Sequence, residues 1–161
     1  MSTTTKARVA PKTPAAEDAI KQLKADHAKV SGLFATYEKT RSVAKKKALV
    51  ADICTELSVH AQIEEEIFYP EVKAALKDHM LVPEATVEHA SVKELIAQIE
   101  AVAPDGEMYD AKVKVLSEYV KHHVKEEQNE MFPKVKASSL DLLELGSRMA
   151  ARKAKLLTMR G

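Results

Sequence analysis

Two stretches of the chain carry the same arrangement of one histidine, one glutamate and one proline. They are HAQIEEEIFYP, residues 60–70, and HVKEEQNEMFP, residues 123–133. Each begins with histidine, has glutamate four residues later and ends in an aromatic residue followed by proline. The separation is 63 residues at all three positions, since 123 − 60, 127 − 64 and 133 − 70 are equal. A repeat of this kind indicates two copies of one structural unit.

Two further histidines precede these stretches. His27 and His89 lie 62 residues apart and stand 33 and 34 residues before the histidines that open the two stretches. The chain is therefore interpreted as a helical hairpin that occurs twice, each copy with one single histidine and one His-x-x-x-Glu pair. Residues four apart are neighbours on one face of an α-helix, so each pair presents an imidazole and a carboxylate together.

These side chains lie on helix faces that are otherwise apolar, where an unpaired carboxylate would take up a proton or destabilise the fold. Metal cations remove that cost, and imidazoles with carboxylates but no thiolate suit iron, manganese or zinc. Two carboxylates among four imidazoles favour two ions over one. The predicted ligands are His27, His60, Glu64, His89, His123 and Glu127. We assign the first two histidines mainly to one ion, the last two to the other, and both glutamates as bridges.

Each part of this pattern also has a simpler interpretation. A single histidine on an apolar face is more often a hydrogen-bonded core residue, and one His-x-x-x-Glu pair is common on exposed helix faces. Two copies in register, with two further histidines, are hard to obtain from packing alone. His122 and Glu126 compete with His123 and Glu127, but His123 keeps the ten-residue distance to the proline and continues the apolar stripe of its helix.

The remaining polar side chains near these stretches are interpreted as structural. The glutamates expected on solvated faces, one of which could supply an extra ligand, are Glu65, Glu66, Glu126 and Glu130. The tyrosines expected to pack, or to hydrogen-bond to a ligand from outside, are Tyr37, Tyr69 and Tyr119. His79 lies in a connector and is expected to be solvated.

The elements that must position these residues are predicted to be helices. Four glycines and six prolines in 161 residues favour long helices over a many-turned β fold. Apolar residues recur at spacings of three and four, as on one helix face. The predicted helices are residues 15–39, 43–77, 84–103, 107–136, and a fifth after Ser138-Ser139 that ends near residue 157. Pro70 and Pro133 are expected to bend or interrupt their helices.

Four helices joined by short connections pack as an antiparallel up-down-up-down bundle. At about 1.5 Å per residue, His89 and His123 stand roughly 22 and 25 Å from the turn between them, so they meet at nearly one level. The predicted fold class is all-α, with a disordered tail over residues 1–14, the bundle over 15–136, and a C-terminal helix over 137–161 that packs on the bundle, across its open end. Gly146 within the last helix weakens that helical pattern.

Composition excludes several classes of protein. The formal net charge of +1 gives no electrostatic argument for binding nucleic acid or an anionic membrane. A single cysteine, Cys54, excludes an intramolecular disulfide and thiolate-rich metal sites. No apolar run approaches the ~20 residues that span a bilayer. The N-terminus has no apolar segment of a secretory signal; its basic, Ser/Thr-rich composition resembles a transit peptide loosely, and we expect a solvated tail and a cytoplasmic protein.

The ordered set of motifs resembles the hemerythrin-like, or HHE cation-binding, domain family. The matching stretches are ADHAKV, HAQIEEEIFYP, VEHASV and HHVKEEQNEMFP, and the resemblance covers about residues 16–136. It implies a four-helix bundle that holds a non-haem pair of iron ions, bridged by carboxylates and an oxo or hydroxo group. The family's ligand pattern falls on the same six residues that the spacing indicates.

One position departs from the oxygen-carrying members of that family. They have a fifth histidine one helical turn after the third ligand, where this chain has Lys93. The resemblance therefore implies a second iron with fewer protein ligands, or one completed by water or another carboxylate, and it points away from simple reversible oxygen carriage.

The six-ligand pattern is similar to bacterial relatives linked to oxidative or nitrosative stress, including iron–sulfur repair proteins, although the cysteine-bearing domain of many repair proteins is missing here. The expected function is a di-iron protein that binds and reacts with O₂, peroxide or NO, with an unidentified redox partner. The alternatives are a non-catalytic O₂ or NO sensor, store or iron reservoir, and a structural bundle that uses its fifth helix for partner contacts.

Overall fold

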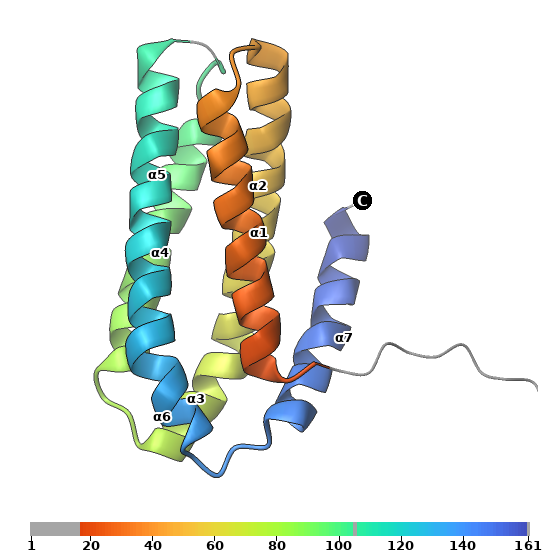
Figure 1. Ribbon diagram of the computed structural model, residues 1–161, viewed down its shortest axis with the longest axis vertical. Coiled ribbons are helices and arrows are strands. Elements are labelled where there is room, and N and C mark those ends of the chain that lie inside the picture. Colours follow the sequence, from red (N-terminus) through yellow and green to blue (C-terminus); the bar gives the residue numbers. More distant parts are fainter. Residues whose placement is uncertain (1–16, 105, 161) are drawn as a thin grey trace, which may run out of the picture.

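A computed structural model describes residues 17–104 and 106–160, and these residues form helices and short connections without a strand (Figure 1). Four long helical arms run alternately up and down, which confirms the all-α class and the predicted bundle. The elements are α1 (Ala19–Lys39), α2 (Val43–Ile63), η1 (Glu64–Phe68), α3 (Tyr69–Leu76), α4 (Leu81–Glu100), α5 (Glu107–Glu126), η2 (Glu127–Met131), α6 (Phe132–Lys136) and α7 (Leu142–Arg160). The tail predicted for residues 1–14 lies outside the described residues. Within the described part of the chain, no helix has the length and apolar character needed to cross a membrane.

Helix boundaries are set by side chains that accept hydrogen bonds from otherwise unpaired backbone N–H groups. The helix predicted to begin at Glu84 begins three residues earlier, because the Asp78 carboxylate accepts from Leu81 N at 3.0 Å and from Val82 N at 2.8 Å. Pro83 is then the third helical residue, where the helix needs no N–H donor. The prediction that Pro83 precedes the helix was therefore wrong.

The two prolines do not end their arms. In both repeats the glutamate of the His-x-x-x-Glu pair opens a five-residue π-helical segment, and the segment is followed by the aromatic–Pro step. Tyr69 N donates to Glu64 O and Phe132 N donates to Glu127 O, each five residues back. An α-helical proline would press its ring against the carbonyl four residues back. The wider turn avoids that conflict, so the predicted interruption takes the form of a π segment, a feature common at functional sites.

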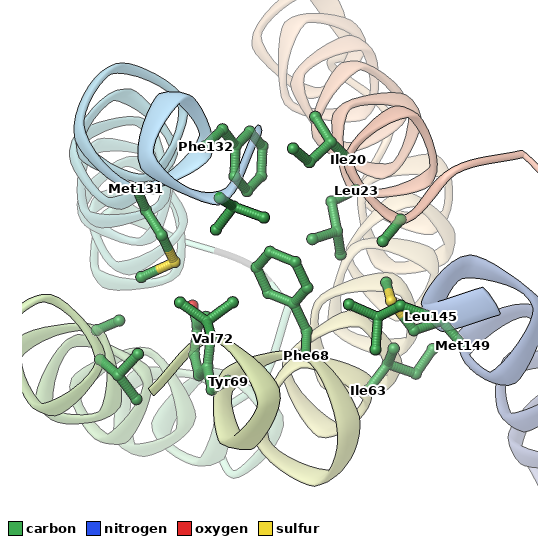
Figure 2. Close-up of a cluster of buried hydrophobic side chains, with 14 of the residues drawn as sticks. Ile20, Leu23, Ile63, Phe68, Tyr69, Val72, Met131, Phe132, Leu145 and Met149 are labelled. Atoms are coloured by element: carbon green, nitrogen blue, oxygen red, sulfur yellow. The ribbon is translucent and has the colours of Figure 1, made fainter. Parts of the chain in front are cut away.

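Two apolar clusters fill the bundle at different heights. The cluster at the α3–α6 end has Phe68 at its middle, with Leu145 and Met149 of α7 on one side and Met131 and Phe132 on the other (Figure 2). The cluster at the opposite end contains Val30, Phe34, Ile53, Leu57, Ile96, Ile99 and Leu116, among others. On three arms the predicted ligands fall between the two clusters in sequence, and on the arm that begins with α2, His60 and Glu64 alternate with Val59 and Ile63 of the first cluster. Apolar packing therefore lies on both sides of the centre.

The last helix differs from the prediction at its start and in its position. Asp141, rather than the serines before it, accepts from Glu144 N at 3.0 Å, so α7 begins at Leu142. It lies along α1 and α2 instead of across the open end of the bundle (Figure 1). Gly146 stays helical and provides the close approach, because its carbonyl accepts from the Gln22 side-chain amide at 2.7 Å beside the first turn of α1.

Gly146→Ala is expected to destabilise the chain. A Cβ there would overlap the backbone oxygen of Glu17 and lie 2.9 Å from Ala19 N, so α7 or the start of α1 must move. Overpacking of this kind costs about 1–3 kcal/mol. Gly32→Ala is the matched control, since a Cβ at this exposed α1 position meets no atom within 4 Å. The control should gain about 0.4–1 kcal/mol. Thermal unfolding followed by circular dichroism distinguishes the two, and equal midpoints would contradict the close approach.

Candidate metal centre

The structure brings the six sequence-predicted residues together between the two apolar clusters. Their side chains come from all four arms, and none of the six residues is more than 8% exposed. His123 lies inside this group, whereas the side chain of the competing His122 is 65% exposed and lies outside it. The centre is therefore a buried polar layer in an otherwise apolar bundle.

The four imidazoles form two pairs. Nε2 of His27 is 3.2 Å from Nε2 of His60, and Nε2 of His89 is 3.2 Å from Nε2 of His123. Both pairs join an α-helix that carries a single histidine to an arm that carries a His-x-x-x-Glu pair. These are the two pairs of histidines that we assigned to separate ions from the sequence.

Each glutamate faces one histidine of each pair. Glu64 Oε1 lies 3.0 Å from Nε2 of His60 and 3.3 Å from Nε2 of His89. In the other repeat, Glu127 Oε1 lies 3.4 Å from Nε2 of His27, and its Oε2 lies 3.1 Å from Nε2 of His123. Two triads result, and in each the ligand atoms lie within 4.8 Å of one another: His27, His60 and Glu127; Glu64, His89 and His123. A carboxylate between two imidazole pairs has the position of a bridging ligand.

The polar atoms of this layer are poorly satisfied by one another. Both carboxylate oxygens of Glu64 and Oε1 of Glu127 are buried and have no hydrogen-bond partner among the described residues. Of these, the two Oε1 atoms lie near imidazole nitrogens without hydrogen-bond geometry, as do atoms that converge on a common point. Burying unpaired carboxylates is costly, and imidazole with carboxylate is a donor set that suits iron, manganese or zinc. The residues present therefore fit metal cations.

The sequence matches a family model over most of the bundle. The model of the Hemerythrin HHE cation binding domain matches residues 18–135. The chain belongs to this family. The crystal structure of a hemerythrin HHE cation binding domain-containing protein from Mycobacterium kansasii superposes with a TM-score of 0.75, at 28% identity and with 87% of each chain covered.

Curated relatives extend this similarity. An uncharacterised protein of Mycobacterium tuberculosis is 27% identical over 111 residues, which cover 67% of each chain. A protein of Nostoc sp. described as a DNA nickase is 27% identical over 136 residues, and the match spans 83% of this chain but only 38% of that protein. The similarity to the nickase is thus confined to a part of its length.

Two acidic residues orient the imidazoles of this HHE domain from outside. His60 Nδ1 donates to Asp26 Oδ2 at 2.9 Å, and His123 Nδ1 donates to Glu88 Oε1 at 2.9 Å. A carboxylate can only accept here, so Nδ1 carries a proton in both histidines, and the neutral imidazole presents the lone pair of Nε2 to the centre. The sequence interpretation missed both acids, although each directly precedes one of the single histidines.

Tyr69 hydrogen-bonds to a predicted ligand, which is one of the two roles expected of the tyrosines from the sequence. Its hydroxyl donates to Glu127 Oε2 at 2.6 Å and lies 3.3 Å from Nε2 of His89 and 3.3 Å from Nε2 of His123. The equivalent residue of the second repeat is Phe132, which stacks on the His27 ring at 6.1 Å between centroids. The replacement of phenylalanine by tyrosine in the aromatic–Pro step was the available signal, and it makes the two halves of the centre different.

Lys93, which replaces the fifth histidine of oxygen carriers, points away from the centre. Its ammonium binds both oxygens of Glu65 at 2.7 and 2.8 Å, and its side chain is 54% exposed. Glu65 Oε2 is 3.8 Å from His89 Nδ1, on the outer side of that ring. Neither residue of this ion pair therefore takes the place of the missing histidine, and the Tyr69 hydroxyl lies nearest to that half of the centre.

The charges of the layer shift the pKa values of its groups. Burial lowers the pKa of His123, but the hydrogen bond and charge of Glu127 outweigh burial and raise it to about 9. Burial also lowers the pKa of His60, yet the charge of Glu64 raises it well above the usual range. Burial raises the pKa of Glu64, but the charge of His60 holds it well below its usual range. In the metal-free chain these two imidazoles hold protons at neutral pH.

Metal affinity is expected to rise with pH up to about 9. His60 and His123 must lose protons to become ligands, and their raised pKa values mean that protons still compete at pH 7. If both are displaced, affinity changes by up to about 100-fold per pH unit. Anaerobic Fe²⁺ titrations at pH 6, 7 and 8 measure this dependence, and an affinity that is constant over the range would contradict it.

A small apolar cavity adjoins the imidazoles. Its volume is about 30 Å³, and it is lined by carbon atoms of Val30, Leu57, Val92, Val120 and Val124 together with the four histidines. One water occupies roughly 10–15 Å³ by this measure, so the cavity has room for a molecule of two or three atoms.

Proposed function

We propose that this HHE-family chain binds two iron ions in the buried layer and reacts with O₂, peroxide or NO in an oxidative or nitrosative stress response. The observation that carries the proposal is the pair of imidazole pairs spanned by two glutamates whose oxygens have no other partner. His27, His60 and Glu127 would hold one ion, and Glu64, His89 and His123 the other. Iron is chosen over manganese or zinc because the hemerythrin-like proteins that the motifs resemble hold a pair of iron ions, whereas the matched family model names only a cation.

Bound iron supplies Lewis acidity and one-electron redox chemistry. The protein supplies orientation, since Asp26 and Glu88 fix the Nδ1–H tautomers of His60 and His123. It also supplies selection by size, because the cavity beside the imidazoles holds only a few atoms. These two properties support small diatomic or peroxidic ligands over larger substrates.

Tyr69 is the proton donor that the centre offers. Burial and the charges of Glu64 and Glu127 raise its pKa well above the usual range, so the hydroxyl keeps its proton at neutral pH. Its oxygen lies 3.3 Å from Nε2 of both histidines of the second triad. The hydroxyl is therefore placed to donate a hydrogen bond, or a proton, to a small molecule that enters this half of the centre.

The test compares iron-loaded wild-type protein with Tyr69→Phe and with Tyr37→Phe, whose hydroxyl donates to Asp110 at 2.6 Å away from the centre. Each is given hydrogen peroxide alone, or O₂ together with ascorbate as electron donor, and consumption is followed with electrodes beside the visible spectrum. We expect wild type and Tyr37→Phe to consume the oxidant repeatedly, and Tyr69→Phe to keep its iron but react at least about tenfold more slowly. Reversible O₂ binding without turnover in all three would favour the sensor or store instead.

A further inference from the structure

The two repeats differ on the outer sides of their oriented histidines. Residues that correspond by the 62- and 63-residue offsets are Asp26 and Glu88, Val59 and His122, and Ile63 and Glu126. In the first repeat, Val59 and Ile63 are 1% and 3% exposed and pack in one cluster with residues of α7. In the second repeat none of the described helices covers the equivalent side (Figure 1), and a histidine and a glutamate replace the two apolar residues.

The charges on the two sides differ in the same way. Asp26, which accepts from His60, has its other oxygen 2.7 Å from the Lys153 ammonium of α7. Glu88 accepts from His123 in the same manner, but among residues 17–104 and 106–160 no lysine or arginine forms an ion pair with it or with Glu126. In the first repeat the Lys153 ammonium thus neutralises the outer carboxylate, Asp26. In the second repeat no lysine or arginine of the described residues does so for Glu88.

The side chains of Glu88, His122 and Glu126 are close enough to one another to hold a metal ion. His122 Nε2 lies 3.4 Å from Glu88 Oε2 and 3.3 Å from Glu126 Oε1, and the three ligand atoms lie within 4.8 Å of one another. One imidazole and two carboxylates, without thiolate, suit Fe²⁺ or Mn²⁺. Positions toward solvent remain free for water, as expected of a site that exchanges its ion.

We propose that Glu88, His122 and Glu126 form an outer binding site for a divalent metal ion, from which ions pass to the buried centre. A cavity of about 20 Å³, enough for one water-sized particle, is lined by Glu88 and Glu126 at the outer side and by His123 and Glu127 at the inner side. Glu127 is 2% exposed and is one of the predicted ligands, so the inner end of this cavity lies at a carboxylate of the buried centre. The supply role rests on the proposed metal centre, whereas the outer site itself does not.

The outer site is tested by Mn²⁺ binding to the full chain as purified, after its metal content has been measured. The variant is His122→Gln with Glu126→Gln, which leaves Glu88 in place to orient His123. The charge-matched control is His79→Gln with Glu118→Gln, two exposed residues outside the cluster. Electron paramagnetic resonance of free Mn²⁺ should show one more bound ion per chain in wild type and control than in the variant. Equal Mn²⁺ binding by variant and control overturns the outer site.

The supply role is tested by the rate at which metal-depleted protein regains iron from anaerobic Fe²⁺. The variant should load the buried centre at least about tenfold more slowly than the control, in the range that local charge gives to association rates, and both should keep the same iron content after loosely held ions are removed by desalting. Equal loading rates overturn the supply role. A failure of the metal centre has a different result, since then neither protein retains iron after desalting.

Discussion

Glu64→Ala is expected to lose iron from both halves of the centre. The Glu64 carboxylate is completely buried and faces His60 of one imidazole pair and His89 of the other. Loss of a group that only orients a ligand already lowers metal affinity about 10–100-fold, and loss of a bridging ligand should exceed this range. Elemental analysis of the purified variant measures the effect, and a variant that keeps two iron ions per chain would show that Glu64 is not a ligand.

Three histidine variants extend the same measurement, and two of them are controls that should keep the metal. His123→Ala should lose metal, because the imidazole lies in the buried layer and contacts Glu127 at 3.1 Å. His122→Ala and His79→Ala should keep the full content of the buried centre, since both side chains are exposed. If His122→Ala empties the centre while His123→Ala leaves it full, the register of the second repeat is wrong by one residue.

Removal of metal should lower the thermal midpoint by about 10 °C. A ligand present at 1,000 times its dissociation constant stabilises the folded state by about 4.1 kcal/mol, and 1 kcal/mol corresponds to about 2–4 °C for a chain of this size. The physical reason is the buried layer, in which Glu64 and Glu127 carry oxygens without hydrogen-bond partners. Differential scanning calorimetry of iron-loaded and chelator-treated protein measures the difference.

The effect of metal removal should also depend on pH. In the metal-free chain His123 has its pKa raised to about 9, and that of His60 is raised as well. Raised imidazole pKa values contribute stability below the unfolded-state value of about 6.5, and this contribution is lost as pH rises through about 9. The free energy of unfolding of the metal-free protein should therefore be lower at pH 9 than at pH 6. Metal-free protein that is as heat-resistant as the iron-loaded form at both pH values would contradict the account.

The positions of the six clustered residues were predictable because the repeat supplies two constraints at once. A four-residue spacing puts His60 beside Glu64 on one helix face, and the second copy selects His123 over the adjacent His122. Burial then follows from the apolar stripe on which each of these residues lies. The fold class was predictable for the same reason, since long periodic stripes with few glycines leave little choice other than a helical bundle.

Features that depend on contacts between distant elements were not predictable. Tyr69 was expected either to pack or to hydrogen-bond to a ligand from outside, but the ligand that it reaches depends on the π turn, which sets the spacing between Glu64 and the residue five positions later. The path of α7 along α1 depends on the close approach at Gly146, which in the sequence indicates only a weaker helix. The asymmetry between Asp26 and Glu88 likewise becomes visible only when Lys153 is placed next to the first of them.

Anomalous X-ray scattering at the iron edge, from crystals of protein grown with iron, shows whether two iron ions occupy the buried layer. We expect two strong peaks inside the bundle, one among His27, His60 and Glu127 and one among Glu64, His89 and His123. A well-ordered bundle with the same six side chains buried and no anomalous peak among them would contradict it.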